Sequence, residues 1–169
     1  MTITLEGKRG LVMGVANERS IAWGIAKACH EAGAELAFTH QGEAFGKRLA
    51  PLAESVGSDF MVDVDVTDDA SLDAAFESLG KRWDRLDFLV HAIAFSDKSE
   101  LQGRFLNTSR ANFKNSMDIS VYSFIEVARR AYPLMTEGGT MLTLTYQGSQ
   151  RVVPNYNVMG VAKAALESA

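Results

Sequence analysis

Short apolar segments alternate with segments of helical periodicity along the whole chain, and no other sequence feature constrains the fold as strongly. We expect strands at residues 10–15, 34–39, 59–66, 87–93 and 139–145. We expect helices at residues 20–29, 45–56, 71–83 and 112–135, and a last one that begins at residue 156. A sheet whose strands alternate with helices is parallel and covered on both faces. The predicted fold is therefore α/β, a Rossmann-type doubly wound parallel sheet.

Size and charge narrow the class of protein further. The 169 residues suit one domain, residues 1–169. A net charge of -4 without a basic stripe argues against a nucleic-acid partner. The N-terminus lacks the apolar core of a signal peptide, and no apolar run approaches membrane-spanning length, so we expect a soluble cytoplasmic protein. The single cysteine, Cys29, cannot form an internal disulfide and is expected to be a small buried hydrophobe.

The segment after the first predicted strand is a candidate nucleotide site, because ligands bind beyond the carboxyl ends of the strands in such sheets. Gly14 permits a sharp turn, and Ser20 and the backbone N–H of Ile21 come at a helix N-terminus, where pyrophosphate binds well. Gly24 is expected to let this helix approach the sheet. The spacing is not the regular G-x-G-x-x-G fingerprint. The alternative is a plain glycine turn with a serine cap, but the position after the first strand favours nucleotide binding.

The next two strand ends carry further candidates. Neither an acid nor an arginine stands directly at the second end, where Gln41 can bond neutral hydroxyls and favours NADH over NADPH. The neighbouring His40 is interpreted as an ordinary loop histidine. At the third end, Asp65 could accept from the adenine amine while the Val66 backbone meets the ring edge. Asp65 could equally be a turn or capping residue ahead of Thr67.

The fourth and fifth strand ends differ in character. His91 lies within the fourth predicted strand and is interpreted as a core histidine rather than a catalyst. Near the fifth, Tyr156 and Lys163 are seven residues apart, so on a helix both side chains share one face, about 10 Å apart along the axis. The lysine charge is expected to lower the pKa of the tyrosine and suit it to proton donation. Such a pair also arises often by chance.

Together these residues resemble one known family. The matching segments are Gly14…Ser20…Gly24, Asp65-Val66, residues 91–95 and Tyr146…Tyr156…Lys163. They are similar to the NADH-dependent enoyl-[acyl-carrier-protein] reductases of bacterial type II fatty-acid synthesis, a divergent branch of the short-chain dehydrogenases/reductases. Ordinary members of that superfamily have a catalytic serine thirteen residues before the tyrosine, where this chain has Thr143. The enoyl reductases use a tyrosine instead, and Tyr146 matches it.

The resemblance implies a function. Hydride passes from NADH to C3 of a trans-2-enoyl thioester carried on acyl carrier protein, and Tyr156 stabilises the charge that develops on the thioester oxygen. Lys163 is expected to bind the nicotinamide ribose, and Tyr146 to line the same site. The implied cofactor contacts are those of Gly14, Ser20, Ile21, Gln41, Asp65, Val66, Ile93 and Lys163. Ser96 is expected beside the substrate. The family also implies a homotetramer and no metal.

The C-terminal end departs from the family pattern. The chain stops six residues after Lys163, and it offers five strands where a six-stranded dinucleotide fold needs another. We therefore expect a fragment of a longer protein. Two alternatives stay open: a 3-ketoacyl or other carbonyl reductase of the same superfamily, against which Thr143 and Tyr146 argue, and a non-catalytic NAD-binding module.

Overall fold

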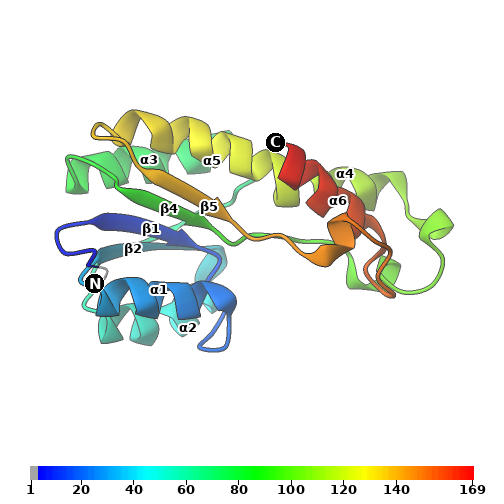
Figure 1. Ribbon diagram of the computed structural model, residues 1–169, viewed down its shortest axis with the longest axis horizontal. Coiled ribbons are helices and arrows are strands. Elements are labelled where there is room, and N and C mark those ends of the chain that lie inside the picture. The colour runs from blue at the N-terminus through cyan, green and yellow to red at the C-terminus, as the bar shows by residue number, and fades with distance from the viewer. Residues whose placement is uncertain (1–3) are drawn as a thin grey trace. The chain divides into compact units, whose positions relative to one another are not determined.

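A computed structural model describes residues 4–169 and contains one parallel sheet. Its strands are β1 (Arg9–Met13), β2 (Glu35–His40), β3 (Met61–Asp63), β4 (Phe88–His91) and β5 (Thr140–Thr143). They lie in the order β3-β2-β1-β4-β5, and every neighbouring pair is parallel (Figure 1). The sequence prediction of a Rossmann-type α/β sheet is confirmed.

Within residues 4–169, six α-helices accompany the strands. They are α1 (Ile21–Glu31), α2 (Gly42–Ser55), α3 (Asp69–Arg82), α4 (Arg110–Met117), α5 (Ser123–Ala131) and α6 (Asn157–Ser168). The chain divides into two compact units. The first unit comprises Met1–Ala92 and Ala128–Thr143, and the second unit comprises Ile93–Val127 and Leu144–Ala169.

The first unit contains the whole sheet. Helices α1 and α2 cover one face and α3 covers the other (Figure 1). Between the sheet and α1, the Trp23 ring lies 6.4 Å from the Phe38 ring, centroid to centroid, and both side chains are buried beside Val12. Strands buried on both faces need apolar residues at successive positions, and β1 has them: four of its five residues are buried. This core fixes the positions of the strand ends that carry the candidate cofactor residues.

Three predicted elements differ from the observed ones for local reasons. The third predicted strand shrinks to Met61–Asp63, because the Asp65 carboxylate accepts a 2.9 Å hydrogen bond from the Thr67 N–H and turns the chain. The helix predicted at residues 45–56 is observed as α2, Gly42–Ser55, which begins three residues earlier and runs through Pro51 without a break. The long predicted helix 112–135 is instead α4, a π-helical turn at Asp118–Tyr122, α5 and a 3-10 turn at Tyr132–Leu134.

The second unit is mostly helical. Its core joins Val121 of the π-helical turn to Met159, Ala162 and Leu166 of α6. The polar stretch that precedes α4 is largely exposed and contains two 3-10 turns, Lys98–Glu100 and Phe105–Asn107. Core contacts along α6 therefore orient the helix that carries Lys163.

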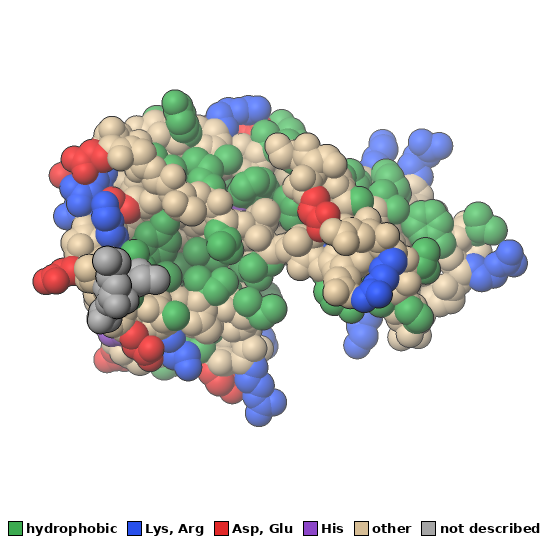
Figure 2. Space-filling model, viewed as in Figure 1, with side chains coloured by type: hydrophobic (Ala, Val, Ile, Leu, Met, Phe, Trp, Pro, Cys, Tyr) green, Lys and Arg blue, Asp and Glu red, His purple; other side chains and the backbone are tan. Residues whose placement is uncertain are grey.

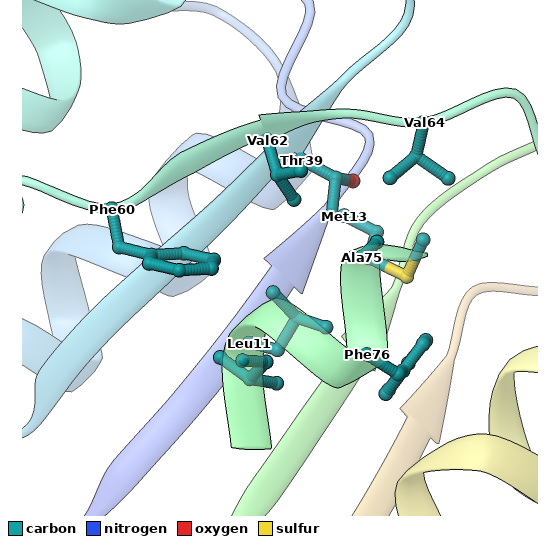
Figure 3. Close-up of a pocket in the computed structure, with 9 residues that line it drawn as sticks. Leu11, Met13, Thr39, Phe60, Val62, Val64, Ala75 and Phe76 are labelled. Atoms are coloured by element: carbon teal, nitrogen blue, oxygen red, sulfur yellow. The ribbon is translucent and has the colours of Figure 1, made fainter. Parts of the chain in front are cut away.

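A small cavity lies in the first unit, between the sheet and α3. Figure 3 shows its lining, in which Thr39 is the one side chain with a polar atom among otherwise apolar residues. Its volume of about 10 Å³ is at the lower limit for a single water molecule. The space is a local packing defect rather than a substrate site.

The surface adds two observations. On the face seen in Figure 2, acidic and basic side chains are scattered among polar and hydrophobic ones. None of the helices within residues 4–169 is both long enough and apolar enough to cross a membrane.

The expected burial of Cys29 is wrong. Its side chain is only partly buried, because α1 directs that position to the edge of the core. This partial burial still raises the pKa of the thiol.

Candidate active site

The turn after β1 requires glycine. Gly14 has a φ of +92°, and a Cβ atom there would lie 2.1 Å from the carbonyl oxygen of Ala92. The chain then reaches Ser20, which caps α1: its Oγ accepts a 3.3 Å hydrogen bond from the Trp23 N–H and donates a 2.7 Å hydrogen bond to the Asn17 carbonyl. The predicted turn and serine cap are therefore both present.

The start of α1 offers donors to an anion. The first N–H groups of a helix have no acceptor within the helix, and the helix dipole adds partial positive charge there. Ile21, at the first helical position, is 69% exposed, so a ligand can reach this end of α1. The expectation for Gly24 is wrong. It is exposed, and a Cβ atom would meet nothing within 4 Å, so close packing on the sheet is not what this position requires.

The ends of β2 and β3 bring two predicted cofactor residues together. Gln41 precedes α2, and its side chain lies near enough to the Asp65 carboxylate to contribute to its lowered pKa. Asp65 also accepts hydrogen bonds from the Thr67 hydroxyl at 2.7 Å and from its N–H at 2.9 Å. The Thr67 hydroxyl, the Thr67 N–H and Gln41 lower the pKa of Asp65, so this carboxyl carries a negative charge at neutral pH. The turn role of Asp65 is established, and Val66 beside it is half-buried, while contact of these two residues with adenine stays a prediction.

The end of β4 has no exposed catalyst. His91 is fully buried, with one ring nitrogen 3.3 Å from the Thr143 hydroxyl of β5. Its interpretation as a core histidine is confirmed. The next residue in the cofactor set, Ile93, is half-buried and begins the second unit.

In the second unit, two tyrosine rings meet. The Tyr146 and Tyr156 rings pack edge to face, with centroids 4.9 Å apart. Gly148 makes room for them: a Cβ atom there would lie 2.4 Å from Cδ1 of Tyr156. Tyr146 is 48% exposed, whereas Tyr156 is half-buried. The two phenols therefore belong to one local arrangement, as the family resemblance implies.

Lys163 is held independently of Tyr156. Its side chain is 6% exposed, and Nζ donates a 2.6 Å hydrogen bond to the Leu144 carbonyl. Burial lowers the pKa of this lysine. The expected lowering of the tyrosine pKa is wrong for this structure: burial, and then the neighbouring Tyr146, raise the pKa of Tyr156. Tyr156 is therefore a protonated hydrogen-bond donor at neutral pH.

Ser96 lies in a network of buried polar side chains from α4. Its Oγ accepts from Asn112 Nδ2 at 3.1 Å and from Ser116 Oγ at 2.9 Å. Asn112 Oδ1 also accepts from the Asp97 N–H at 2.9 Å. One turn on, Ser120 Oγ accepts from the Phe95 N–H at 3.0 Å. These partners of Ser96 and Phe95 were not predicted from the sequence, although the polar residues at 112, 116 and 120 follow helical spacing and were a usable signal.

The sheet and the turn after β1 together define a class of protein. A parallel sheet in the order β3-β2-β1-β4-β5, with a glycine turn and a capped helix after β1, is a Rossmann-type nucleotide-binding fold. Residues 14–169 match the family model described as enoyl-(acyl carrier protein) reductase. The chain belongs to this family.

Individual relatives agree with this assignment. The chain is 63% identical over 164 residues to a Rhizobium meliloti protein named enoyl-[acyl-carrier-protein] reductase [NADH] 2, covering 97% of this chain and 61% of that one. The crystal structure of FabI from Candidatus Liberibacter asiaticus matches with a TM-score of 0.97 and 61% identity, over 99% of this chain and 65% of that one.

A second solved structure includes a ligand. It is an enoyl-(acyl-carrier-protein) reductase from Anaplasma phagocytophilum in complex with NAD, with a TM-score of 0.95 and 55% identity, over 99% of this chain and 65% of that one. Among the curated relatives, the chain spans 61% of the Rhizobium meliloti protein and 64% of a Rickettsia typhi homologue.

Proposed function

We propose that the protein of which this chain is part is an NADH-dependent enoyl-[acyl-carrier-protein] reductase. It would reduce the trans-2 double bond of an enoyl thioester carried on acyl carrier protein, as the names of its relatives indicate. The observation that carries the proposal is the Tyr146–Tyr156 pair: two phenols in contact, of which the half-buried one is protonated at neutral pH.

The second-unit residues have the chemistry for this reaction. NADH, when bound, supplies the hydride that adds to C3 of the enoyl group. Negative charge then develops on the thioester oxygen, and the Tyr156 hydroxyl donates a hydrogen bond or its proton to that oxygen. The second phenol, Tyr146, lines the site beside it. Ser96 is held by Asn112 and Ser116 and is proposed to lie beside the substrate.

Separate groups of residues are suited to hold the cofactor. Gly14, with its close approach to Ala92, leaves the start of α1 open, and Ser20 and Ile21 are proposed to hold the pyrophosphate there. Gln41, Asp65 and Val66 are proposed to contact the adenosine part. Ile93 and Lys163 are proposed to contact the nicotinamide ribose part, where the buried ammonium of Lys163 supplies positive charge.

Thr143 supports this function over carbonyl reduction. It occupies the position at which ordinary short-chain reductases have a catalytic serine, but its hydroxyl lies 3.3 Å from the buried His91 ring. A hydroxyl engaged by a buried histidine ring is a poor partner for a substrate carbonyl. The tyrosine that the enoyl reductases use in its place is Tyr146.

Substrate comparison tests the proposal. The full-length protein should oxidise NADH with a crotonyl thioester and not with an acetoacetyl thioester. Turnover of the acetoacetyl thioester alone would favour the carbonyl reductase. Binding of NADH without turnover of either thioester would favour a non-catalytic module. A cytoplasmic location and a single domain, both expected from the sequence, are further parts of this proposal, and so is a homotetramer, which is carried from the family resemblance alone.

A further inference from the structure

Two asparagines with unusual backbone conformations flank Tyr156. Asn155 has a φ of 60° and Asn157 a φ of 35°, and no other non-glycine residue within residues 4–169 has a positive φ. Positive φ is strained for most L-residues but tolerated by asparagine, aspartate and glycine. The chain therefore enters α6 through a narrow choice of residue types on either side of the tyrosine.

The two asparagine side chains differ in what they contact. Asn157 is half-buried, and its Nδ2 donates hydrogen bonds to the carbonyl oxygens of Glu100, at 3.0 Å, and Gly103, at 3.5 Å. Asn155 is exposed, and within the described residues its side chain makes no hydrogen bond. Asn157 thus ties the first turn of α6 to the loop that precedes α4.

That loop is itself fixed. The Glu100 carboxylate accepts a 2.8 Å hydrogen bond from the Ser109 N–H and a 3.3 Å hydrogen bond from Asn112 Nδ2. Asn112 is 7% exposed and also holds Ser96. The Glu100 carbonyl, which accepts the hydrogen bond from the Asn157 amide, therefore belongs to a residue anchored to a buried network. It can define a position for the Asn157 side chain.

The position of the neighbouring Tyr156 ring is closely defined by its packing. Tyr156 is the N-terminal flanking residue of α6. Its ring packs over Gly148 and meets the Tyr146 ring edge to face. Because a side chain at a helix end moves with the first turn, a small rotation of that turn displaces the phenol. A displacement of about 1 Å at a reacting group can lower turnover by about a hundredfold.

We infer that Asn157 is a positioning residue for Tyr156: its amide anchors the first turn of α6 to the Glu100–Gly103 loop and so fixes where the phenol lies. The inference rests on the proposed function, in which Tyr156 acts on the thioester oxygen. Asparagine meets both needs of the position, which glycine and aspartate do not. Glycine tolerates the φ but has no amide, and aspartate tolerates the φ but would direct a carboxylate at two carbonyl oxygens.

Two substitutions and matched controls test this role in the full-length protein. Asn157→Gly and Asn157→Asp should lower kcat by about ten- to a hundredfold and leave the KM for NADH near its wild-type value. Asn155→Gly and Asn155→Asp make the same chemical changes at a positive φ two residues away, and should keep wild-type kcat. Melting temperatures of all four variants separate loss of fold from loss of position.

A second measurement does not depend on turnover. An absorbance titration of tyrosinate, compared with that of Tyr156→Phe, isolates the titration of Tyr156. Because Tyr156 is held partly buried, Asn157→Gly should shift its titration towards that of an exposed tyrosine, and Asn155→Gly should not. If the wild-type enzyme shows no enoyl reduction, the proposed function fails while this titration still tests the anchor. Wild-type kcat and an unchanged titration in Asn157→Gly would overturn the inference.

Discussion

The rings of Tyr146 and Tyr156 meet edge to face, with an interplanar angle of 68° and 4.9 Å between their centroids. Edge-to-face contact is a favoured geometry for aromatic pairs and contributes about 0.5–1.5 kcal/mol beyond burial. Burial and the neighbouring phenol both raise the pKa of Tyr156, so its hydroxyl stays protonated through neutral pH. The contact between the rings thus adds to the effect of burial in favouring the protonated form of Tyr156.

Removal of each hydroxyl should distinguish the roles of the two phenols. Tyr156→Phe keeps the ring contact but deletes the proposed oxyanion donor, so kcat should fall by about 10²–10³ with NADH binding intact. Tyr146→Phe should lower kcat less, because the more exposed ring lines the site and does not supply the main donor. Steady-state kinetics with a crotonyl thioester measure both effects. Equal losses in the two variants would contradict the assignment of Tyr156 as the principal donor.

Substitution of Lys163 should weaken cofactor binding more than it slows the chemical step. Lys163→Ala removes a buried ammonium and its 2.6 Å hydrogen bond to the Leu144 carbonyl. The KM and the Kd for NADH should therefore rise by more than kcat falls, the reverse of the pattern expected for Tyr156→Phe. Lys163→Arg, which keeps the positive charge, should recover part of the affinity. Unchanged NADH affinity in Lys163→Ala would remove the ribose role from this lysine.

The sequence predicted the parts of the fold that depend on periodicity. Every predicted strand is present, and Ser20 caps α1 as expected, because both signals are local. The early end of β3 was harder to predict. It depends on the hydrogen bond that the Asp65 carboxylate accepts from the Thr67 N–H, which turns the chain where strand propensity favours a longer strand. The π-helical turn at Asp118–Tyr122 likewise depends on packing, with Val121 directed into the core of the second unit.

In the candidate site, too, the features that depend on tertiary packing could not be predicted from the sequence. The pairing of Tyr146 with Tyr156 was accessible through the family resemblance, but the raised pKa of Tyr156 was not, because it depends on how deeply the fold buries the ring. Spacing on a helix suggested that Lys163 acts on Tyr156. In the structure the Lys163 ammonium instead bonds the Leu144 carbonyl, a backbone atom distant in sequence. Sequence spacing identifies residues that share a face, but not the partners that a fold selects for them.

NADH binding should be sensitive to the size of the side chain at position 20. Ser20→Leu places a bulky side chain at the N-terminus of α1, so NADH should bind at least about tenfold more weakly, while loss of the cap costs about 1 kcal/mol of stability. Ser20→Ala is the matched control, because it loses the cap without adding bulk. Calorimetric titration of the full-length variants with NADH, beside their melting temperatures, separates the two effects. Normal NADH affinity in a folded Ser20→Leu protein would refute the pyrophosphate assignment.

Gln41 should make the protein prefer NADH to NADPH. Its side chain lies against the negatively charged Asp65, which disfavours an additional phosphate. The nearest cations in sequence are engaged elsewhere: Lys47 pairs with Glu43 at 2.6 Å, and the Arg48 guanidinium lies 5.5 Å from the Phe45 ring centroid. Direct titration should give a lower Kd for NADH. Gln41→Arg should narrow the difference, and equal or tighter binding of NADPH by the wild-type protein would contradict this role.

Asp87 should control stability in acid. Its side chain is 8% exposed and accepts hydrogen bonds of 2.9 Å from both Lys8 Nζ and the Arg9 N–H. Burial by itself raises the pKa of the Asp87 carboxyl, but the hydrogen bonds from Lys8, Arg9 and Arg85 outweigh it and lower the pKa.

Because the folded-state pKa of Asp87 lies below its unfolded value, the stabilisation is fully present above the ordinary pKa of an aspartate carboxyl, 3.8, and is lost as pH falls through the lower folded pKa. Asp87→Asn should therefore cost about 2 kcal/mol at neutral pH and should flatten the acid side of the stability curve. The matched control is Asp84→Asn, which removes an exposed ion-pair partner of Arg9 and should cost under about 1 kcal/mol. Denaturant unfolding between neutral and acidic pH measures both variants. An acid transition in Asp87→Asn as steep as that of the wild type would show that other carboxylates govern acid stability.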